Sequence, residues 1–456
     1  MDTSIFKAYD IRGVYPDQVD EEVAWKVGYA AARFLPSLLR GYERGQANAQ
    51  SICVARDMRT HSPALTEALI DGICCTGADV IDIGMIDTPQ MYFAVNYLGT
   101  CGGVQVTASH NPAKYNGFKV SGLEARPVGV DTGLKEIQHI TTSLLHTKGN
   151  RTGSVTQRDL TPEYKEHVLK FLQPKIKKLK IAIDASNGMA GKMVPAIFGE
   201  LPIEIIPINF EHTGKFKHEP NPLIEENLVQ LKAAIRKRKC DMGICFDGDA
   251  DRLILIDEQA QTVACDIMTA LMATYFLKKE PSSTIVYDLR SSRVVVEEII
   301  KHGGTPRRER VGHAFMKKAL RDSHGIFGGE LSGHFYYREN YFADSGMITL
   351  VHLLNIFSQS EKTVSEIIQP LRRYYRSGEI NFRIENKQAK MDELAKIYAD
   401  GQADQLDGVT VQYKDWWFNC RPSNTEPLLR LNIEAKTADL LQKKLAEIEA
   451  KLGKPI

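Results

Sequence analysis

The sequence predicts an α/β protein that ends in a smaller α+β region. Short apolar runs rich in β-branched residues recur along most of the chain, and helix-like segments separate them. This alternation is typical of parallel sheets with helices on both faces, because such strands are buried on both sides. Towards the C-terminus the alternation gives way to strands that follow one another directly, which indicates antiparallel pairing.

Seven segments are expected to form strands of the α/β part. Each is a short apolar run followed by a turn that carries Gly or Asp. Between them lie segments in which apolar residues recur at helical spacing, as in 62–77 and 292–304. The expected strands are 51–55, 79–84, 103–106, 180–184, 242–246, 253–257 and 284–288.

The C-terminal region reads differently. The segments 408–421 and 428–435 are expected to be paired antiparallel strands. An amphipathic helix is expected to follow at 437–453, where apolar residues recur at helical spacing. This region is therefore the α+β part of the protein.

Length and charge exclude several classes of protein. A chain of 456 residues suggests about three domains. Lys and Arg number 58 against 57 Asp and Glu, so no overall basic field favours a nucleic-acid partner. The N-terminus has neither the basic nor the apolar region of a signal peptide, and the apolar stretch 347–357 is too short to span a bilayer. Eight scattered cysteines without C-x-x-C spacing favour free thiols. We expect a cytoplasmic, multi-domain, soluble protein with no membrane partner.

The segment DGDADR (247–252) is the strongest chemical signal. Asp247, Asp249 and Asp251 alternate with small residues directly after an expected strand, so one loop can bring three carboxylates together. Unpaired carboxylates would repel one another, which points to a hard divalent cation. An EF-hand is excluded, because Arg252 stands where its sharp turn needs glycine. A solvated acidic turn is the plain structural alternative. Magnesium with a phosphate is the expected pairing.

The segment TASHNP (107–112) also follows an expected strand. Ser109 beside His110 suggests a serine hydrolase, but no G-x-S-x-G elbow is present and an adjacent histidine rarely has the geometry of a general base. Taken alone, Ser109 is an ordinary turn serine. The carboxylate loop changes this interpretation, because a phosphorylated serine would offer a cation a charged oxygen.

Two further segments could bind polar ligands. RPSNTEP (421–427) supplies a guanidinium and several short side-chain donors in one turn, which suits a phosphate dianion. GGELSGH (328–334) places Glu330, Ser332 and His334 at alternate positions, so an extended backbone would present them on one side to sugar hydroxyls. A connecting turn and a polar strand edge are the plain alternatives.

Taken together these segments resemble the α-D-phosphohexomutase superfamily. The resemblance covers essentially the whole chain, in the order expected for the family, and is nearest to its bacterial phosphomannomutase and phosphomannomutase/phosphoglucomutase branch. The segments that carry it are FKAYDIRG (6–13), TASHNP (107–112), NGFK (116–119), DGDADR (247–252), VGHAFMK (311–317), GELSGH (329–334) and RPSNTEP (421–427).

The resemblance implies a fold of three related mixed α/β domains plus a smaller C-terminal α+β domain around a central cleft. Domain I (1–148) would carry the phosphoserine loop and domain II (149–253) the metal loop. Domain III (254–370) would carry the sugar-binding loop and domain IV (371–456) the phosphate-binding loop. The composition alone suggests only about three domains, so the fourth comes from the resemblance.

The resemblance also implies a reaction, the interconversion of hexose 1-phosphate and hexose 6-phosphate. A phosphoserine would give its phosphoryl group to the sugar, a hexose 1,6-bisphosphate intermediate would reorient, and the other phosphate would return to the serine. The expected cofactors are one Mg²⁺ per chain and hexose 1,6-bisphosphate as activator. The expected partners are sugar phosphates, and the expected assembly is a monomer or weak homodimer.

Site residues follow from the matching motifs. The implied catalytic residues are Ser109, His110, Lys119, Arg252 and His334, with Lys119 or His334 as a general acid or base whose pKa is drawn toward neutrality. The implied metal ligands are Ser109, Asp247, Asp249 and Asp251. The implied substrate contacts are Tyr9, Arg12, Arg290, His313, Glu330, Ser332, Arg421, Ser423, Asn424 and Thr425.

Two positions depart from the family pattern. Leu331 replaces the usual methionine, a change that conserves volume and apolar character. Arg290 stands where the bifunctional enzymes often have lysine, so the charge is kept but the geometry of the substrate contact differs. A phosphoglucosamine mutase, whose branch typically has glutamine at the position of Leu331, is one alternative. A catalytically silent sugar-phosphate-binding relative is the other, and an intact Ser109 disfavours it.

Overall fold

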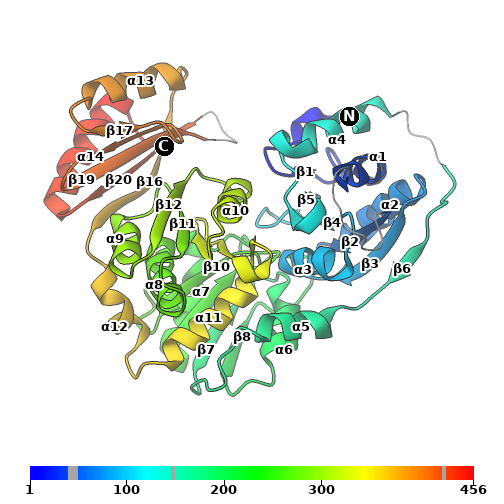
Figure 1. The fold of residues 1–456 in the computed structure, drawn as a ribbon, viewed down its shortest axis with the longest axis horizontal. Helices are drawn as coiled ribbons and strands as arrows, with labels where there is room; N and C mark the ends of the chain where they lie inside the picture. The colour runs from blue at the N-terminus through cyan, green and yellow to red at the C-terminus, as the bar shows by residue number, and fades with distance from the viewer. Residues whose placement is uncertain (40–49, 145–148, 424–427) are drawn as a thin grey trace. The chain divides into compact units, whose positions relative to one another are not determined.

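The computed structural model describes residues 1–39, 50–144, 149–423 and 428–456 (Figure 1). The chain divides into two compact units. The first unit comprises Met1–Ala264 and Ser332–Ile367. The second comprises Cys265–Leu331 and Ile368–Ile456. Each unit has apolar cores of its own.

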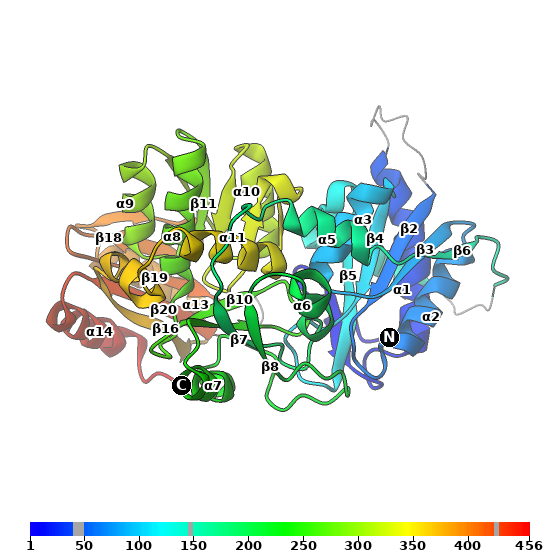
Figure 2. The ribbon, with the colours of Figure 1, turned by 90° about the horizontal axis from the view of Figure 1, so that it is seen from below.

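A six-stranded sheet forms the centre of the N-terminal α/β domain, in the order β1-β5-β4-β2-β3-β6. Strands β4, β2, β3 and β6 run parallel, and β5 and β1 are added antiparallel at one edge. Ile52 and Val54 of β2 join the core beneath α1 and α2, whereas Cys53 and Ala55 face the core of α3, so helices cover both faces (Figure 2). The bounds are β1 (Ile11–Val14), β2 (Ser51–Arg56), β3 (Asp79–Met85), β4 (Gly102–Val106), β5 (Tyr115–Ser121), β6 (Val155–Gln157), α1 (Glu21–Phe34), α2 (Ser62–Cys74), α3 (Thr88–Leu98) and α4 (Lys135–Ser143).

A four-stranded sheet in the same unit repeats this plan. Its order is β10-β9-β7-β8, with β7 parallel to both β8 and β9 and with β10 antiparallel to β9. Just as β5 returns beside β4, β10 returns beside β9, so each domain carries one tight loop at the end of a buried strand. The bounds are β7 (Lys180–Asp184), β8 (Glu204–Ile208), β9 (Met242–Phe246), β10 (Leu253–Asp257), α5 (Thr161–Leu169), α6 (Ala190–Phe198) and α7 (Val229–Arg238).

The first unit is completed by a short hairpin and two helices. β14 (Phe335–Tyr337) pairs antiparallel with β15 (Ala343–Asp344), and α11 (Gly346–Ser358) and α12 (Val364–Ile368) follow. All residues from Gly346 to Phe357 are buried, so the apolar stretch noted in the sequence is a core helix. Within the described ranges, none of the helices combines the length and the apolar character needed to cross a bilayer.

The second unit contains a third α/β domain and the C-terminal domain. In the third domain β11 lies parallel between β12 and β13. The C-terminal sheet is antiparallel throughout, in the order β16-β20-β19-β18-β17. The bounds are β11 (Thr284–Asp288), β12 (Thr305–Glu309), β13 (Phe327–Gly329), β16 (Tyr375–Arg383), β17 (Gln402–Asp404), β18 (Val409–Gln412), β19 (Trp416–Pro422), β20 (Leu428–Ala435), α8 (Cys265–Lys279), α9 (Arg293–Lys301), α10 (His313–Asp322), α13 (Lys387–Ile397) and α14 (Ala438–Leu452).

The predicted fold class is confirmed, with three α/β domains and a C-terminal α+β domain. All seven expected strands form within a residue or two of their predicted ends. The expected strand 408–421 is instead a hairpin, because a turn at 413–415 separates β18 from β19. The expected domain boundaries stay a prediction, although β6 joins the first sheet from beyond residue 148.

Candidate active site

Ser109 lies in the loop that joins β4 to β5, and it is almost fully buried. Its backbone has a positive φ of 49°, a conformation that is uncommon for residues other than glycine. The Ser109 amide donates to the hydroxyl of Thr107 at 2.9 Å. The side-chain oxygen lies 3.2 Å from Nδ1 of His110. The backbone conformation, the amide hydrogen bond and the contact with His110 together orient the Ser109 side chain.

The carboxylate loop occupies the equivalent place in the next domain, between β9 and β10. Asp247, Asp249 and Asp251 are all buried, and their ligand oxygens lie within 4.8 Å of one another. Ala250 takes a positive φ of 57°, which turns the chain tightly enough to direct the three side chains together. The sequence prediction that these carboxylates gather around one point is confirmed.

The two loops are in direct contact. The hydroxyl of Ser109 donates to Oδ2 of Asp247 at 3.0 Å. Gly248 permits this approach, because a Cβ at that position would lie only 2.4 Å from the carbonyl oxygen of Ser109. Two loops separated by more than a hundred residues in sequence thus share one centre.

The residues present fit a divalent metal ion. Burial, together with Asp251 and Asp249, raises the pKa of Asp247 well above its ordinary value, since three buried carboxylates repel one another. Oδ1 of Asp249 is buried without a hydrogen-bond partner in the described part of the chain. An all-oxygen donor set with an unsatisfied buried carboxylate oxygen suits a hard cation such as Mg²⁺.

Two cationic side chains neutralise part of this charge. Lys119, on β5, donates to Asp249 and Asp251 at 2.7 Å each. Burial lowers the pKa of Lys119, but the two carboxylates outweigh burial and the net shift is upward. The two carboxylates therefore favour the charged form of Lys119, and the role of Lys119 or His334 as a general acid or base stays a prediction. Arg252 donates its backbone N–H to Asp247 at 3.2 Å, and its Nε lies 3.4 Å from Nε2 of His334.

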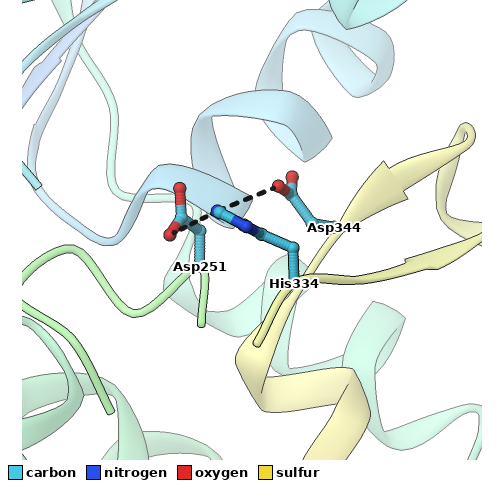
Figure 3. Close-up of side chains that lie close together, drawn as sticks. All are labelled: Asp251, His334 and Asp344. Atoms are coloured by element: carbon cyan, nitrogen blue, oxygen red, sulfur yellow. Dashed lines mark ion pairs between the residues drawn. The ribbon is translucent and has the colours of Figure 1, made fainter. Parts of the chain in front are cut away.

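His334 stands between two carboxylates, as Figure 3 shows. Its Nε2 lies 3.4 Å from Oδ1 of Asp251 and 3.9 Å from Oδ2 of Asp344. Its Nδ1 lies 2.8 Å from the hydroxyl of Ser332. These contacts orient the ring, and Asp344, on β15, is a site residue that sequence reasoning missed.

Two of the remaining expected residues of the first unit, Arg12 and His110, lie at the serine loop. Arg12, on β1, donates to the side chains of Asn111 and Asp10. Tyr9 is half-buried in the segment that precedes β1. Burial, and then Arg252 and Arg12, hold the pKa of His110 well below its ordinary value, so its imidazole is neutral at physiological pH.

Three arginines converge on one carboxylate in the second unit. Glu379, on β16, accepts hydrogen bonds from Arg421 at 2.9 Å, Arg430 at 3.1 Å and Arg290 at 3.2 Å. Arg290 also binds Asp288, so its guanidinium is held on both sides. Glu379 was not expected from the sequence, because its partners lie on three separate strands and loops.

The other expected substrate contacts of the second unit are placed as follows. Glu330 is buried and accepts from the backbone N–H of Gly312 at 3.2 Å, next to His313 at the start of α10. Ser423 is buried after β19, and its N–H donates to the carbonyl of Leu428 at 2.9 Å. Asn424 and Thr425 lie outside the described residues.

The expected extended conformation of GELSGH is wrong. Residues 330–333 form a turn between β13 and β14, and Gly333 has a positive φ of 87°. The alternate spacing of Glu330, Ser332 and His334 therefore does not place them on one side of a strand. The glycine at the sharpest point was the signal that favoured a turn.

Glu379→Gln is expected to lower the free energy of unfolding by about 1–3 kcal/mol at neutral pH and to make it less dependent on pH in the acid range. Burial alone would raise the pKa of Glu379, but Arg290, Arg421 and Arg430 lower it from 4.5 to about 2. A lowered carboxyl pKa contributes stability above pH 4.5 that is lost as pH falls toward 2. Chemical denaturation at several pH values measures this. The free energies of unfolding of the variant and the wild type should become equal near the lower pH. The control is Glu385→Gln at an exposed position, which should match the wild type at every pH. A difference between Glu379→Gln and wild type that stays constant at all pH values would contradict the ion-pair account.

The fold and the paired loops define the class as phosphohexose mutases, isomerases that move a phosphoryl group within a sugar phosphate. The chain belongs to the phosphoglucomutase/phosphomannomutase family, within the α-D-phosphohexomutase superfamily. Residues 3–147, 162–260 and 265–374 match the family's alpha/beta/alpha domains I, II and III, and residues 379–451 match its C-terminal domain.

Relatives match over nearly the whole chain. A phosphomannomutase of Vibrio cholerae is 37% identical over 462 residues, which cover 99% of this chain and 98% of that protein. A protein of Xanthomonas campestris described as "Phosphohexose mutases" is 36% identical over 449 residues, with 97% and 98% covered. The crystal structure of a phosphoglucomutase/phosphomannomutase family protein from Burkholderia thailandensis has a TM-score of 0.88 at 31% identity, with 99% of this chain and 97% of that chain covered.

Proposed function

We propose that this chain is a phosphomannomutase that also accepts glucose phosphates, and that it works through a phosphorylated Ser109. The observation that carries the proposal is the hydrogen bond of 3.0 Å between the Ser109 hydroxyl and Asp247. It places a serine oxygen at the edge of a buried carboxylate cluster, where a phosphoryl group and a cation would meet. The similarity to proteins named phosphomannomutase supports mannose phosphates as the main substrates.

The reaction has two balanced phosphoryl transfers. In the first, the bond between phosphorus and Oγ of phospho-Ser109 breaks as phosphorus bonds to the free hydroxyl of a hexose 1-phosphate. That hydroxyl gives up its proton, and the released serine oxygen gains one. In the second, after the bisphosphate reorients, the bond between phosphorus and O1 breaks as phosphorus bonds to Oγ of Ser109. The serine hydroxyl gives up its proton, O1 gains one, and hexose 6-phosphate is released. The enzyme ends as it began, phosphorylated.

The residues around Ser109 supply charge and position. Asp247, Asp249 and Asp251 would hold Mg²⁺, which when bound neutralises charge on the phosphoryl group. Lys119 and Arg252 add positive charge beside the same carboxylates. Positioning and electrostatic stabilisation are the main sources of catalysis in phosphoryl transfer. We therefore expect these fixed charges to supply most of the rate enhancement.

His334 is the proposed proton acceptor in this arrangement. Its ring is fixed by Ser332 on one side and by Asp251 and Asp344 on the other. Lys119 is the alternative, but it would first have to leave its two ion pairs. A base must be held in place before its pKa matters, and His334 meets that condition directly.

Arg421 is the proposed anchor for the substrate's other phosphate, with Ser423, Asn424 and Thr425 beside it in sequence. Arg421 is only 2% exposed, and its Nε is buried with no hydrogen-bond partner among the described residues. A buried guanidinium with a donor to spare suits an anionic ligand. Glu330, Ser332, His313, Arg290, Tyr9 and Arg12 are the other proposed substrate contacts.

Arg421→Gln is expected to raise KM for hexose phosphates about 10–100-fold, because a lost charge-assisted hydrogen bond is worth roughly 1.5–3 kcal/mol. The change in kcat should be smaller, since the anchor binds the phosphate that is not being transferred. Steady-state kinetics measure both. Arg430→Gln is the matched control, because Arg430 also pairs with Glu379 but lies outside the phosphate-binding motif. Equal effects of the two substitutions would contradict the assignment.

A substrate panel tests the proposed function. The 1-phosphates of mannose, glucose and glucosamine are incubated separately with Mg²⁺ and trace glucose 1,6-bisphosphate, and kcat/KM is compared. We expect turnover of mannose phosphate, slower or comparable turnover of glucose phosphate and little of the glucosamine compound. Preference for the last would make the chain a phosphoglucosamine mutase. No turnover by a folded enzyme phosphorylated at Ser109 would support a silent sugar-phosphate-binding relative.

A further inference from the structure

Arg59 lies between β2 and α2, outside every motif that carries the family resemblance, and it is only 2% exposed. Its guanidinium binds four backbone carbonyl oxygens of the serine loop. Nη2 donates to Ser109 at 3.0 Å and to Asn111 at 2.7 Å. Nη1 donates to Pro112 at 2.8 Å and to Tyr115 at 3.0 Å. One side chain therefore spans the loop from the serine to the start of β5.

The fifth donor of Arg59 is fixed as well. Its Nε donates to Oδ2 of the buried Asp57 at 3.0 Å. Asp57 also accepts from the hydroxyl of Thr107 at 2.8 Å, and that hydroxyl accepts from the Ser109 amide at 2.9 Å. All five N–H donors of the guanidinium are thus used, and Ser109 is held through both its amide and its carbonyl.

This arrangement has a consequence for the peptide groups of the loop. In a trans peptide the N–H points opposite to the preceding carbonyl. With the carbonyls of Ser109 and Pro112 turned toward Arg59, the N–H groups of His110 and Ala113 point away from it. The same contacts hold the positive φ of 49° at Ser109, which a free loop would abandon.

An aromatic side chain from the next domain along the chain contacts Arg59. The ring of Phe216 lies 5.2 Å from the guanidinium carbon, an arrangement that favours a planar cation. Lysine cannot reproduce this geometry. Its ammonium group has three N–H donors on one nitrogen atom and is not planar, whereas the guanidinium has five donors spread over a plane.

We propose that Arg59 is a positioning residue for phosphoryl transfer, which sets the orientation of Ser109 by clamping the carbonyls of its loop. In this role Arg59 neither contacts the substrate nor transfers a proton in the reaction. The proposal rests on the proposed role of Ser109, and it predicts an effect on the transfer step rather than on substrate binding.

The test compares Arg59→Lys and Arg59→Ala with wild type by kcat, KM and melting temperature. Misplacing a reacting group by about 1 Å can cost roughly 100-fold in rate, so kcat should fall about 10–100-fold while KM changes less than about threefold. Guanidinium chloride at low millimolar concentration should restore part of kcat in Arg59→Ala. It should not do so in Arg126→Ala, where the lost arginine is exposed and pairs with Glu124. If Arg59→Ala does not fold, the kcat, KM and melting temperature of Arg59→Lys are compared with those of the wild type.

The outcomes separate the two proposals. Wild-type kcat in a folded Arg59→Lys enzyme, or a lower melting temperature without loss of kcat, would overturn the positioning role and leave the function of Ser109 standing. A rise in KM at unchanged kcat would also overturn it. Full turnover by Ser109→Ala would instead remove the proposed function on which the inference rests.

Discussion

Ser109→Ala is expected to reduce turnover of hexose 1-phosphate by at least about 1,000-fold, the scale seen when a covalent nucleophile is removed. Binding of the sugar phosphate is expected to remain, because the proposed substrate contacts Arg421 and Glu330 are unchanged. Binding measured by calorimetry should therefore persist while turnover disappears. Intact-mass analysis should show a phosphoryl adduct on the wild type and none on the variant.

The control for this substitution is Ser143→Ala, at an exposed serine near the end of α4. It should keep wild-type kcat and wild-type phosphorylation. A Ser109→Ala enzyme that turns over at the wild-type rate would refute the phosphoserine mechanism. One that neither turns over nor binds, with an unchanged melting temperature, would show that Ser109 serves substrate binding instead.

Asp249→Asn is expected to weaken Mg²⁺ binding at least about 100-fold and to reduce kcat correspondingly. Substitution of a partner that merely supports a metal ligand costs 10–100-fold, so loss of a ligand should cost no less. Oδ2 of Asp249 also accepts from the Thr88 hydroxyl and from Lys119, and its Oδ1 has no hydrogen-bond partner among the described residues. Calorimetric Mg²⁺ titration and the rise in melting temperature with added Mg²⁺ measure the effect without any substrate.

The exposed Asp131→Asn is the matched control and should keep the Mg²⁺-dependent rise in melting temperature. An Asp249→Asn protein with the same Mg²⁺ response as wild type would contradict the assignment of the carboxylate loop as the metal site. Loss of the response together with full activity in the presence of a chelator would contradict the role of the metal in turnover.

The α/β strands could be predicted because buried parallel strands require continuous apolar runs, and segments such as 242–246 have no other explanation. The hairpin at β18 and β19 was merged into one strand because Tyr413–Asp415 offered no glycine or proline as a break. The turn at 330–333 was misread for a related reason. Alternate polar residues fit an extended strand equally well, and the pattern outweighed the glycine that the turn requires.

The site could be predicted wherever its residues are contiguous in sequence. Asp247, Asp249 and Asp251 share one loop, so their spacing alone brings them together. Arg59 and Glu379 act through partners that are brought to them only by the fold. No single-sequence pattern distinguishes a buried arginine that binds carbonyls from an ordinary surface arginine.

The charge state of Lys119 could not be predicted either. Its sequence neighbours give it no acidic partner, yet β5 places it 2.7 Å from two carboxylates on another domain. A pKa depends on such distances and on burial, which are properties of the assembled fold.

Transfer of label from the enzyme tests the central claim most directly. Wild-type protein carrying a radioactive phosphoryl group is mixed with unlabelled mannose 1-phosphate in a single turnover, and the products are separated. We predict that label leaves Ser109 and appears first in hexose 1,6-bisphosphate and then in mannose 6-phosphate. Formation of mannose 6-phosphate while the label stays on the protein would contradict a phosphoserine carrier.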